Sequence, residues 1–349
     1  MTYRQYLMTF TCRKEDCSMS RLVFRSIMAC DFEEFIRLKR NLGYKYATEE
    51  YVLRAFDTFL VNRGVTDPVL TKDVFDAWMA RRQHEAGSTY RERCVVAVQF
   101  ARYMSDVGKP CFIPRLPKTK VAGFTAHIFT EEEIGKILSA CDRLTLRSLK
   151  KDSVIIMLPA LIRLLYGTGI RVTEGIMLKD ADVNLVENYI TLRDTKSRKD
   201  RIVPITESLA SVCREYKKYR NMLPVIIDKE YFFLSLAGRR CANDGVIYTW
   251  FRTILREAGI PHNGRHKGPR LHDFRHTFSV HSLARMSGRG IDLYCSLPIL
   301  STYLGHSSIQ STNNYVRLYE SLYPDLIKRL DIDSLNVYPD LYEDENDRL

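Results

Sequence analysis

Six side chains that could together cleave a phosphodiester lie in five short motifs, in the order GTGIRVTE, TKSRKDRIVPI, LHDFRHTF, LGHSS and TNNYVRLY. They are two arginines, two histidines, a lysine and a tyrosine: Arg171, Lys196, His272, Arg275, His306 and Tyr315. Arginine suits the negative charge that builds on the phosphate oxygens, because its planar fork donates two charge-assisted hydrogen bonds and stays protonated. A lysine can protonate the leaving 5′-oxygen, and a tyrosine can attack as nucleophile. The set therefore predicts phosphoryl transfer to a tyrosine without a metal.

Other chemistries find little support. Gly167-x-Gly169 lacks the spacing of a phosphate-binding loop. His262 and His266 are four residues apart but lie among Pro, Asn, Gly and Lys in an expected loop, and the nine cysteines form no C-x-x-C pair. We therefore expect no metal and no cofactor.

The charge of the chain favours a polyanionic partner. Its net charge is +11, and residues 331–349 carry seven acids against one base, which leaves +17 on residues 1–330. A basic body of this kind suits nucleic acid. The most apolar run, 154–165, contains Arg163 and is too short to cross a bilayer. With scattered cysteines and no secretory leader, we expect a cytoplasmic protein without a membrane anchor.

Periodicity and turn signals predict a mainly α fold with a small β-sheet, an α+β class. Helices are expected at 71–82, 90–106, 153–166, 206–221, 244–258, 273–286 and 297–303, and strands within 182–205. Thr48 is expected to cap one helix, and Thr130 with Glu133 has capping-box spacing for another. The parts are an N-terminal extension (1–25), a helical unit (26–108), a basic linker (109–126), a unit with the six residues (127–335) and an acidic tail (336–349).

The linker is proline-rich and basic between Gly108 and Lys120. Prolines make such a segment extended and fairly stiff. It could lie along a duplex backbone, or it could be a plain solvated connection.

The ordered motifs resemble the tyrosine recombinases, the phage integrase family, which includes Xer-type resolvases and transposon integrases. The resemblance covers about residues 30–325. It implies a helical core-binding (SAM-like) DNA-binding domain at 26–108 and a catalytic domain at 127–335. It also implies a site-specific recombinase or integrase that works on double-stranded DNA as a homotetramer on two sites. Strand exchange would pass through a 3′-phosphotyrosyl intermediate and a Holliday junction, without metal or ATP.

The resemblance also implies a role for each residue. Arg171 and Arg275 would clamp the scissile phosphate, and Glu174 would orient the first arginine. Lys196 would be the general acid and His272 would relay the proton of the tyrosine. His306 would bond a non-bridging oxygen, and Tyr315 would be the nucleophile. The expected contacts to the DNA backbone are Arg115, Lys118, Lys120, Lys199 and Arg201.

Some alternatives remain open at this level. Lys199 and Arg201 are rivals of Lys196, and Tyr303 and Tyr319 are rivals of Tyr315. The segment 287–298 is longer than the family pattern, and we expect it to be a loop insertion before His306. A DNA-binding regulator without cleavage, or a type IB topoisomerase acting as a monomer, would share parts of this pattern.

Overall fold

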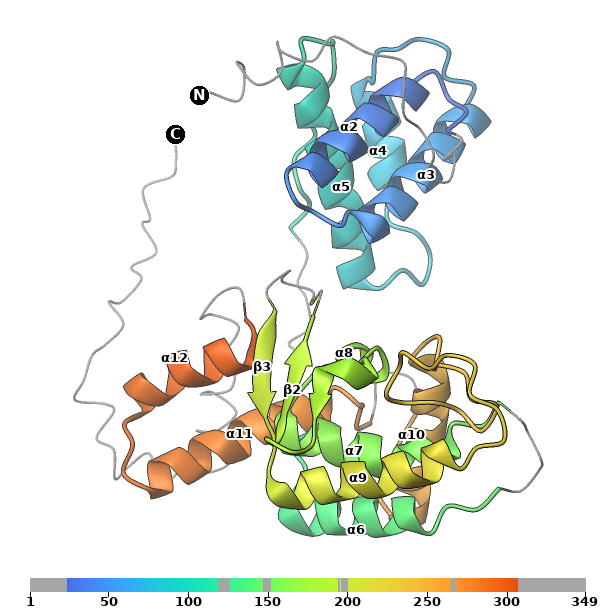
Figure 1. Ribbon diagram of the computed structural model, residues 1–349. Coiled ribbons are helices and arrows are strands. Elements are labelled where there is room, and N and C mark those ends of the chain that lie inside the picture. Colours follow the sequence, from blue (N-terminus) through green and yellow to red (C-terminus); the bar gives the residue numbers. More distant parts are fainter. Residues whose placement is uncertain are drawn as a thin grey trace. The chain divides into compact units, whose positions relative to one another are not determined.

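The computed structural model describes residues 24–118, 126–146, 152–193, 195, 200–264 and 268–306 (Figure 1). The chain divides into two compact units, Met1–Phe124 and Thr125–Leu349, and each has its own hydrophobic core. The described part is mainly helical and has one small antiparallel sheet, so the expected α+β class is confirmed. No described helix is both long and apolar enough to cross a membrane.

The first unit is a helical bundle with an aromatic core. Its helices are α2 (Ala29–Asn41), α3 (Ala47–Asn62), α4 (Lys72–Met79) and α5 (Gly87–Asp106). Phe32 of α2 stacks on Phe100 of α5 with ring centroids 4.4 Å apart, and Phe56 of α3 packs on Trp78 of α4 at 4.8 Å. These rings are buried, so aromatic side chains form the core of this unit.

The start of α3 differs from the expectation that Thr48 caps it. The helix begins one residue earlier, at Ala47, and the residue before it is Tyr46, at φ 47° with no side-chain cap. The ring of Tyr46 is buried edge-on against Phe35, with centroids 5.6 Å apart. Packing of this ring, and not a hydroxyl cap, therefore accompanies the start of α3.

The second unit is built around the apolar helix α7 (Leu158–Thr168), which contacts α6 (Glu131–Asp142), α9 (Glu207–Asn221) and α11 (Asp273–Gly288). Helix α10 (Gly245–Glu257) packs on α6. The remaining helical elements are η1 (Ile155–Met157), α8 (Val172–Ile176), η2 (Asp180–Asp182) and α12 (Leu293–Leu304). The capping box that begins α6 is confirmed: Thr130 accepts from the N–H of Glu133, whose carboxylate accepts from the N–H of Thr130.

The small sheet has the order β1 (Val183–Asn184), β2 (Tyr189–Leu192), β3 (Arg201–Pro204), with antiparallel neighbours. Leu192 pairs with Arg201, and this is the last pair before the hairpin turn. Residues 193–200 connect β2 to β3 in the sequence. Lys196 and Lys199 are among them and lie outside the described residues.

The expected loop insertion at 287–298 is wrong. Helix α11 continues to Gly288, and α12 already begins at Leu293, with Pro298 inside it. Leu297, Leu300 and Leu304 of α12 are buried against Val280 and Leu283 of α11. Because this packing favours the helix, the proline is accommodated, and only a short connection separates the two helices (Figure 1).

Candidate active site

The turn between α7 and α8 places Arg171. Helix α7 ends at Thr168, and Gly169 follows at φ 62°, in the left-handed region that glycine adopts without strain. A Cβ on Gly169 would lie 2.4 Å from Cδ1 of Phe278, so this residue must also be small. The chain can then turn sharply, and Arg171 becomes the residue that precedes α8.

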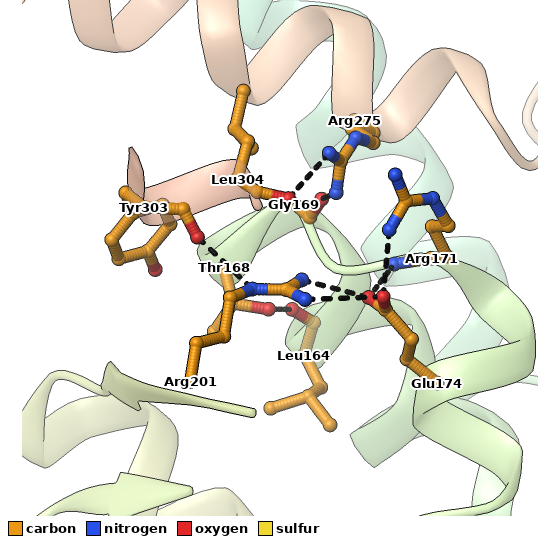
Figure 2. A network of polar contacts seen from close by, with 9 residues as sticks. All are labelled: Leu164, Thr168, Gly169, Arg171, Glu174, Arg201, Arg275, Tyr303 and Leu304. Atoms are coloured by element: carbon orange, nitrogen blue, oxygen red, sulfur yellow. Dashed lines mark hydrogen bonds and ion pairs between the residues drawn. The ribbon is translucent and has the colours of Figure 1, made fainter. Parts of the chain in front are cut away.

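Glu174, in the first turn of α8, is the centre of a polar network (Figure 2). Its carboxylate accepts from the backbone N–H of Arg171 at 2.9 Å and from Nη1 of the same residue at 2.8 Å. It also accepts from Nη1 and Nη2 of Arg201 at 3.2 and 2.9 Å. Burial alone would raise the pKa of Glu174, but the hydrogen bonds and charges of Arg201 and Arg171 lower it below its ordinary value. Glu174 is therefore an anion held between two arginines.

Arg275 is buried in α11, with 2 % of its surface exposed. Nη1 donates to the carbonyl of Gly169 at 2.9 Å, and Nη2 donates to the carbonyl of Leu304 at 2.7 Å. Figure 2 shows this guanidinium beside that of Arg171. One side chain thus joins the turn before Arg171 to the end of α12.

The start of α11 places His272. Asp273, buried at the first position of the helix, accepts from the N–H of Arg270 at 2.8 Å and fixes the entering turn. His272 precedes it, and part of this residue stays exposed. Burial of its ring, followed by the charges of Arg275, Arg270 and Arg171, lowers the pKa of His272 to about 4. Its imidazole is therefore neutral at pH 7 and able to accept a proton.

His306 follows Gly305 directly after α12. Its N–H donates to the carbonyl of Ser301 at 3.0 Å. Burial, then the charges of Arg275 and Arg171, lowers the pKa of His306 to about 4. This second neutral imidazole faces the same two arginines as His272.

Sequence reasoning missed His276, one turn after His272 on α11. Its ring meets that of His272 edge to face, with centroids 4.9 Å apart. Burial, followed by the neighbouring His272 and Arg270, lowers the pKa of His276 to about 3. The i, i+4 spacing of the two histidines on a helix is the signal that could have found it.

Five of the expected residues thus come together in the second unit: Arg171, Glu174, His272, Arg275 and His306. Lys196 and Tyr315, and the rivals Lys199 and Tyr319, lie outside the described residues, as does Lys120. Arg115 and Lys118 are exposed in the first unit. Within the described ranges, no group of three or more His, Cys, Asp or Glu could hold a metal ion.

Two further candidate residues make contacts inside the protein. Arg201, an expected contact to the DNA backbone, has a side chain that is 10 % exposed, pairs with Glu174 and donates through Nε to the carbonyl of Tyr303 at 3.1 Å. The surroundings of Tyr303 disfavour it as the nucleophile. Its ring stacks on Phe278 with centroids 5.4 Å apart, and burial raises its pKa to about 12.

Comparison with known proteins agrees with this arrangement. Residues 127–321, more than half of the chain, match the model of the phage integrase family. A Sinorhizobium fredii protein, y4rB, provisionally described as an integrase/recombinase, is 31 % identical over 302 residues, covering 86 % of this chain and 95 % of its own. Tyrosine recombinase XerD of Listeria monocytogenes is 27 % identical over 316 residues, covering 86 % and 96 %.

Solved structures share the fold. The XerH site-specific recombinase bound to its palindromic difH substrate aligns over 85 % of this chain and 83 % of that chain, with TM-score 0.57 and 18 % identity. A lambda integrase dimer bound to a COC′ core site aligns over 82 % and 94 %, with TM-score 0.55 and 17 % identity. The helical architecture and the clustered arginines and histidines define a tyrosine recombinase. The chain belongs to the phage integrase family.

Proposed function

We propose that this enzyme is a site-specific DNA recombinase that cuts and rejoins double-stranded DNA through a 3′-phosphotyrosyl bond. The observation that supports this most is the meeting of Arg171, Arg275, His272 and His306 around one point of the second unit. DNA as the substrate is supported by the basic body of the chain and by relatives whose structures contain recombination sites.

The arginines bind the scissile phosphate in this mechanism. Arg275 is held by two carbonyls, and Arg171 is held by Glu174, so both guanidinium groups are oriented before DNA arrives. Preorganised cations of this kind stabilise the charge that develops on the non-bridging oxygens in the transition state. His306, neutral in the free protein, adds a hydrogen bond to one of those oxygens.

The tyrosine and the two proton carriers perform the transfer. The phenolic oxygen of Tyr315 forms a bond to phosphorus while the bond to the 5′-oxygen breaks. The tyrosine proton passes to the neutral imidazole of His272, and Lys196 gives a proton to the leaving oxygen. A free 5′-hydroxyl then attacks the phosphotyrosine and reverses these steps. The phosphotyrosyl bond conserves the energy of the cleaved bond, so rejoining needs no ATP and no metal.

We further propose that a homotetramer acts on two DNA sites and exchanges the strands in pairs through a Holliday junction. A role in moving or integrating DNA elements fits the relatives named as integrases, which include a solved transposon integrase.

A nicked suicide substrate tests the proposal. When its short 5′ fragment diffuses away, the reaction cannot reverse and the covalent protein–DNA adduct accumulates. The wild-type chain should form this adduct, and Tyr315→Phe should form none, because phenylalanine has no oxygen to attack phosphorus. Tyr303→Phe is the matched control and should still form it. An adduct that survives Tyr315→Phe, or DNA binding without any strand cleavage by the wild type, would contradict the proposal.

A further inference from the structure

Arg201, the first residue of β3, touches three segments that carry site residues. We propose that Arg201 is a positioning residue of the recombination reaction, which fixes the β2–β3 hairpin, Arg171 and the segment before His306 relative to one another. The inference rests on the proposed function for its reaction, and on the hydrogen bonds of Arg201 for its geometry.

The first contact is with Glu174. Two nitrogens of the guanidinium donate to the two oxygens of this carboxylate, at 3.2 and 2.9 Å. The side chains are 10 % and 8 % exposed, so the pair is shielded from water. A shielded two-pronged pair has one preferred geometry. Glu174 also binds the backbone and side chain of Arg171. By holding this carboxylate, Arg201 therefore also constrains the position of Arg171.

The second contact is with the end of α12. Nε of Arg201 donates to the carbonyl of Tyr303 at 3.1 Å, and Arg275 binds the next carbonyl, that of Leu304. Figure 2 shows Arg201 of β3 and Arg275 of α11 donating to these two neighbouring carbonyls. The carbonyls at a helix end carry partial negative charge, which favours cations there. The position of His306, two residues later, is therefore fixed from both sides.

Gly305 supplies independent support. Its φ is +67°, and a Cβ at this position would lie 3.0 Å from Nη1 and 3.3 Å from Cδ of Arg201. The glycine of the Leu-Gly-His step is thus the residue that lets the Arg201 side chain lie against the end of α12. The Leu-Gly-His sequence therefore places a glycine with positive φ directly beside the side chain of Arg201.

The third contact is within the sheet. Arg201 pairs with Leu192 across the base of the hairpin, and residues 193–200 connect the two along the chain. Whatever holds Arg201 therefore holds one end of the turn to which Lys196 belongs. Arg201 would thus help to position the proposed general acid Lys196, the phosphate-binding Arg171 and His306.

The charge of Arg201 has its own consequence. Glu174 is an anion beside a site that must bind a phosphate anion. With Arg201 present, two cations face it. Without Arg201, a buried carboxylate would have Arg171 as its one ion-pair partner, and the positive potential available to the phosphate would fall.

The test is a set of full-length variants: R201Q, R201K, E174Q and R201Q/E174Q, with R214Q as control. Arg214 is also paired with a glutamate, Glu207, but on the exposed surface of α9. At saturating nicked DNA, R201Q should form adduct at least about tenfold more slowly. R201K should lie between R201Q and wild type, because lysine restores the charge but not the fork. R214Q should match wild type.

A pH profile separates positioning from general loss of fold. Among the described residues, the charged and titratable groups that face Glu174 are Arg171 on its own segment, Arg201 on β3 and His272 before α11. In R201Q the burial of Glu174 is less opposed, so its pKa rises and adduct formation declines at a higher pH than in wild type as the solution is acidified. R201K should keep the wild-type profile. E174Q in the R201Q background should abolish the shift, because no carboxylate remains to titrate.

The salt dependence of DNA binding tests the alternative that Arg201 contacts a phosphate. A positioning residue leaves the salt dependence of binding unchanged. If R201Q instead lowers the slope of log K against log salt by about 0.9 and cleaves normally once saturated, Arg201 is a phosphate contact and the proposal is overturned. Wild-type rate and pH profile in R201Q would overturn it equally.

Urea unfolding tests the role of Arg201 independently of the recombinase proposal. The double-mutant cycle of Arg201 and Glu174 should be non-additive, since each single change removes an ion-pair partner from the other buried charge. If the wild type forms no adduct, the recombinase proposal is contradicted. A non-additive cycle would then still support Arg201 as the residue that positions the site. Additive unfolding midpoints would remove that role whatever reaction the site performs.

Discussion

At the scale of residues, Arg275 combines two roles that usually conflict. A charged side chain with 2 % exposure is unfavourable unless it is paired, and here two backbone carbonyls accept its hydrogen bonds. The same bonds fix the direction of the guanidinium. The same contacts therefore satisfy the buried charge and fix the orientation in which Arg275 is proposed to meet a phosphate.

We expect Arg275→Lys to reduce adduct formation by about 10²-fold or more, since a lysine cannot bond both carbonyls in the same plane and meet the phosphate as a fork. The stability should also fall, because the carbonyls of Gly169 and Leu304 lose partners. The rate on suicide substrate and the thermal midpoint check the two effects. Arg256→Lys, a change in an exposed arginine of α10, is the control. A rate within twofold of wild type in Arg275→Lys would contradict the assignment.

The sequence predicts which residue types gather, but it does not predict their partners. The ordered motifs selected Arg171, His272, Arg275 and His306, and the family resemblance added Glu174. These five residues meet in the structure. Arg201 was expected to contact the DNA backbone. Its pairing with Glu174, 27 positions earlier, depends on how the fold brings β3 near α8, and no local pattern encodes that.

At the scale of elements, the prediction was best where local chemistry decides. The capping box of Thr130 and Glu133 followed from hydrogen-bonding rules that involve only neighbouring residues. It was poorest for α12. Gly288, Gly290 and Pro298 all signal a break, but the leucines of α12 bury against α11, and this long-range packing outweighs the local signals.

The end of α12 gives a prediction with a closely matched control. Gly305 and Gly290 have φ of +67° and +76°, but only Gly305 has Arg201 within contact of an added Cβ, while Gly290 has open space. Alanine should cost about 1 kcal/mol of strain at either position. Gly305→Ala should additionally slow adduct formation, because it displaces Arg201 and with it His306. Unfolding in urea and suicide-substrate rates distinguish the two contributions. Equal rates in both variants would contradict the link between Gly305 and Arg201.

At the scale of the whole molecule, the site makes the fold sensitive to acid. The pKa values of His272, His306 and His276 fall to about 4, about 4 and about 3 in the folded chain, against about 6.5 when unfolded. The unfolded chain therefore binds protons first, and these histidines contribute stability above pH 6.5 that is lost as the pH falls toward 4.

We expect the free energy of unfolding to decline over this interval, and His276→Gln to flatten the decline by an amount on the order of 3 kcal/mol. Urea titrations at several pH values measure it. DNA should oppose the decline, since a phosphate beside His272 and His306 favours their charged forms. If His276→Gln has the same pH dependence as wild type, the ring of His276 is not held neutral by the fold.

The division into Met1–Phe124 and Thr125–Leu349 has a meaning for how such proteins change over time. The described members of the site all belong to the second unit, and the aromatic core of the first unit contains none of them. A lineage that exchanged the first unit would therefore keep every described member of the site, and a chimaera made at residue 124 would reproduce that exchange in the laboratory.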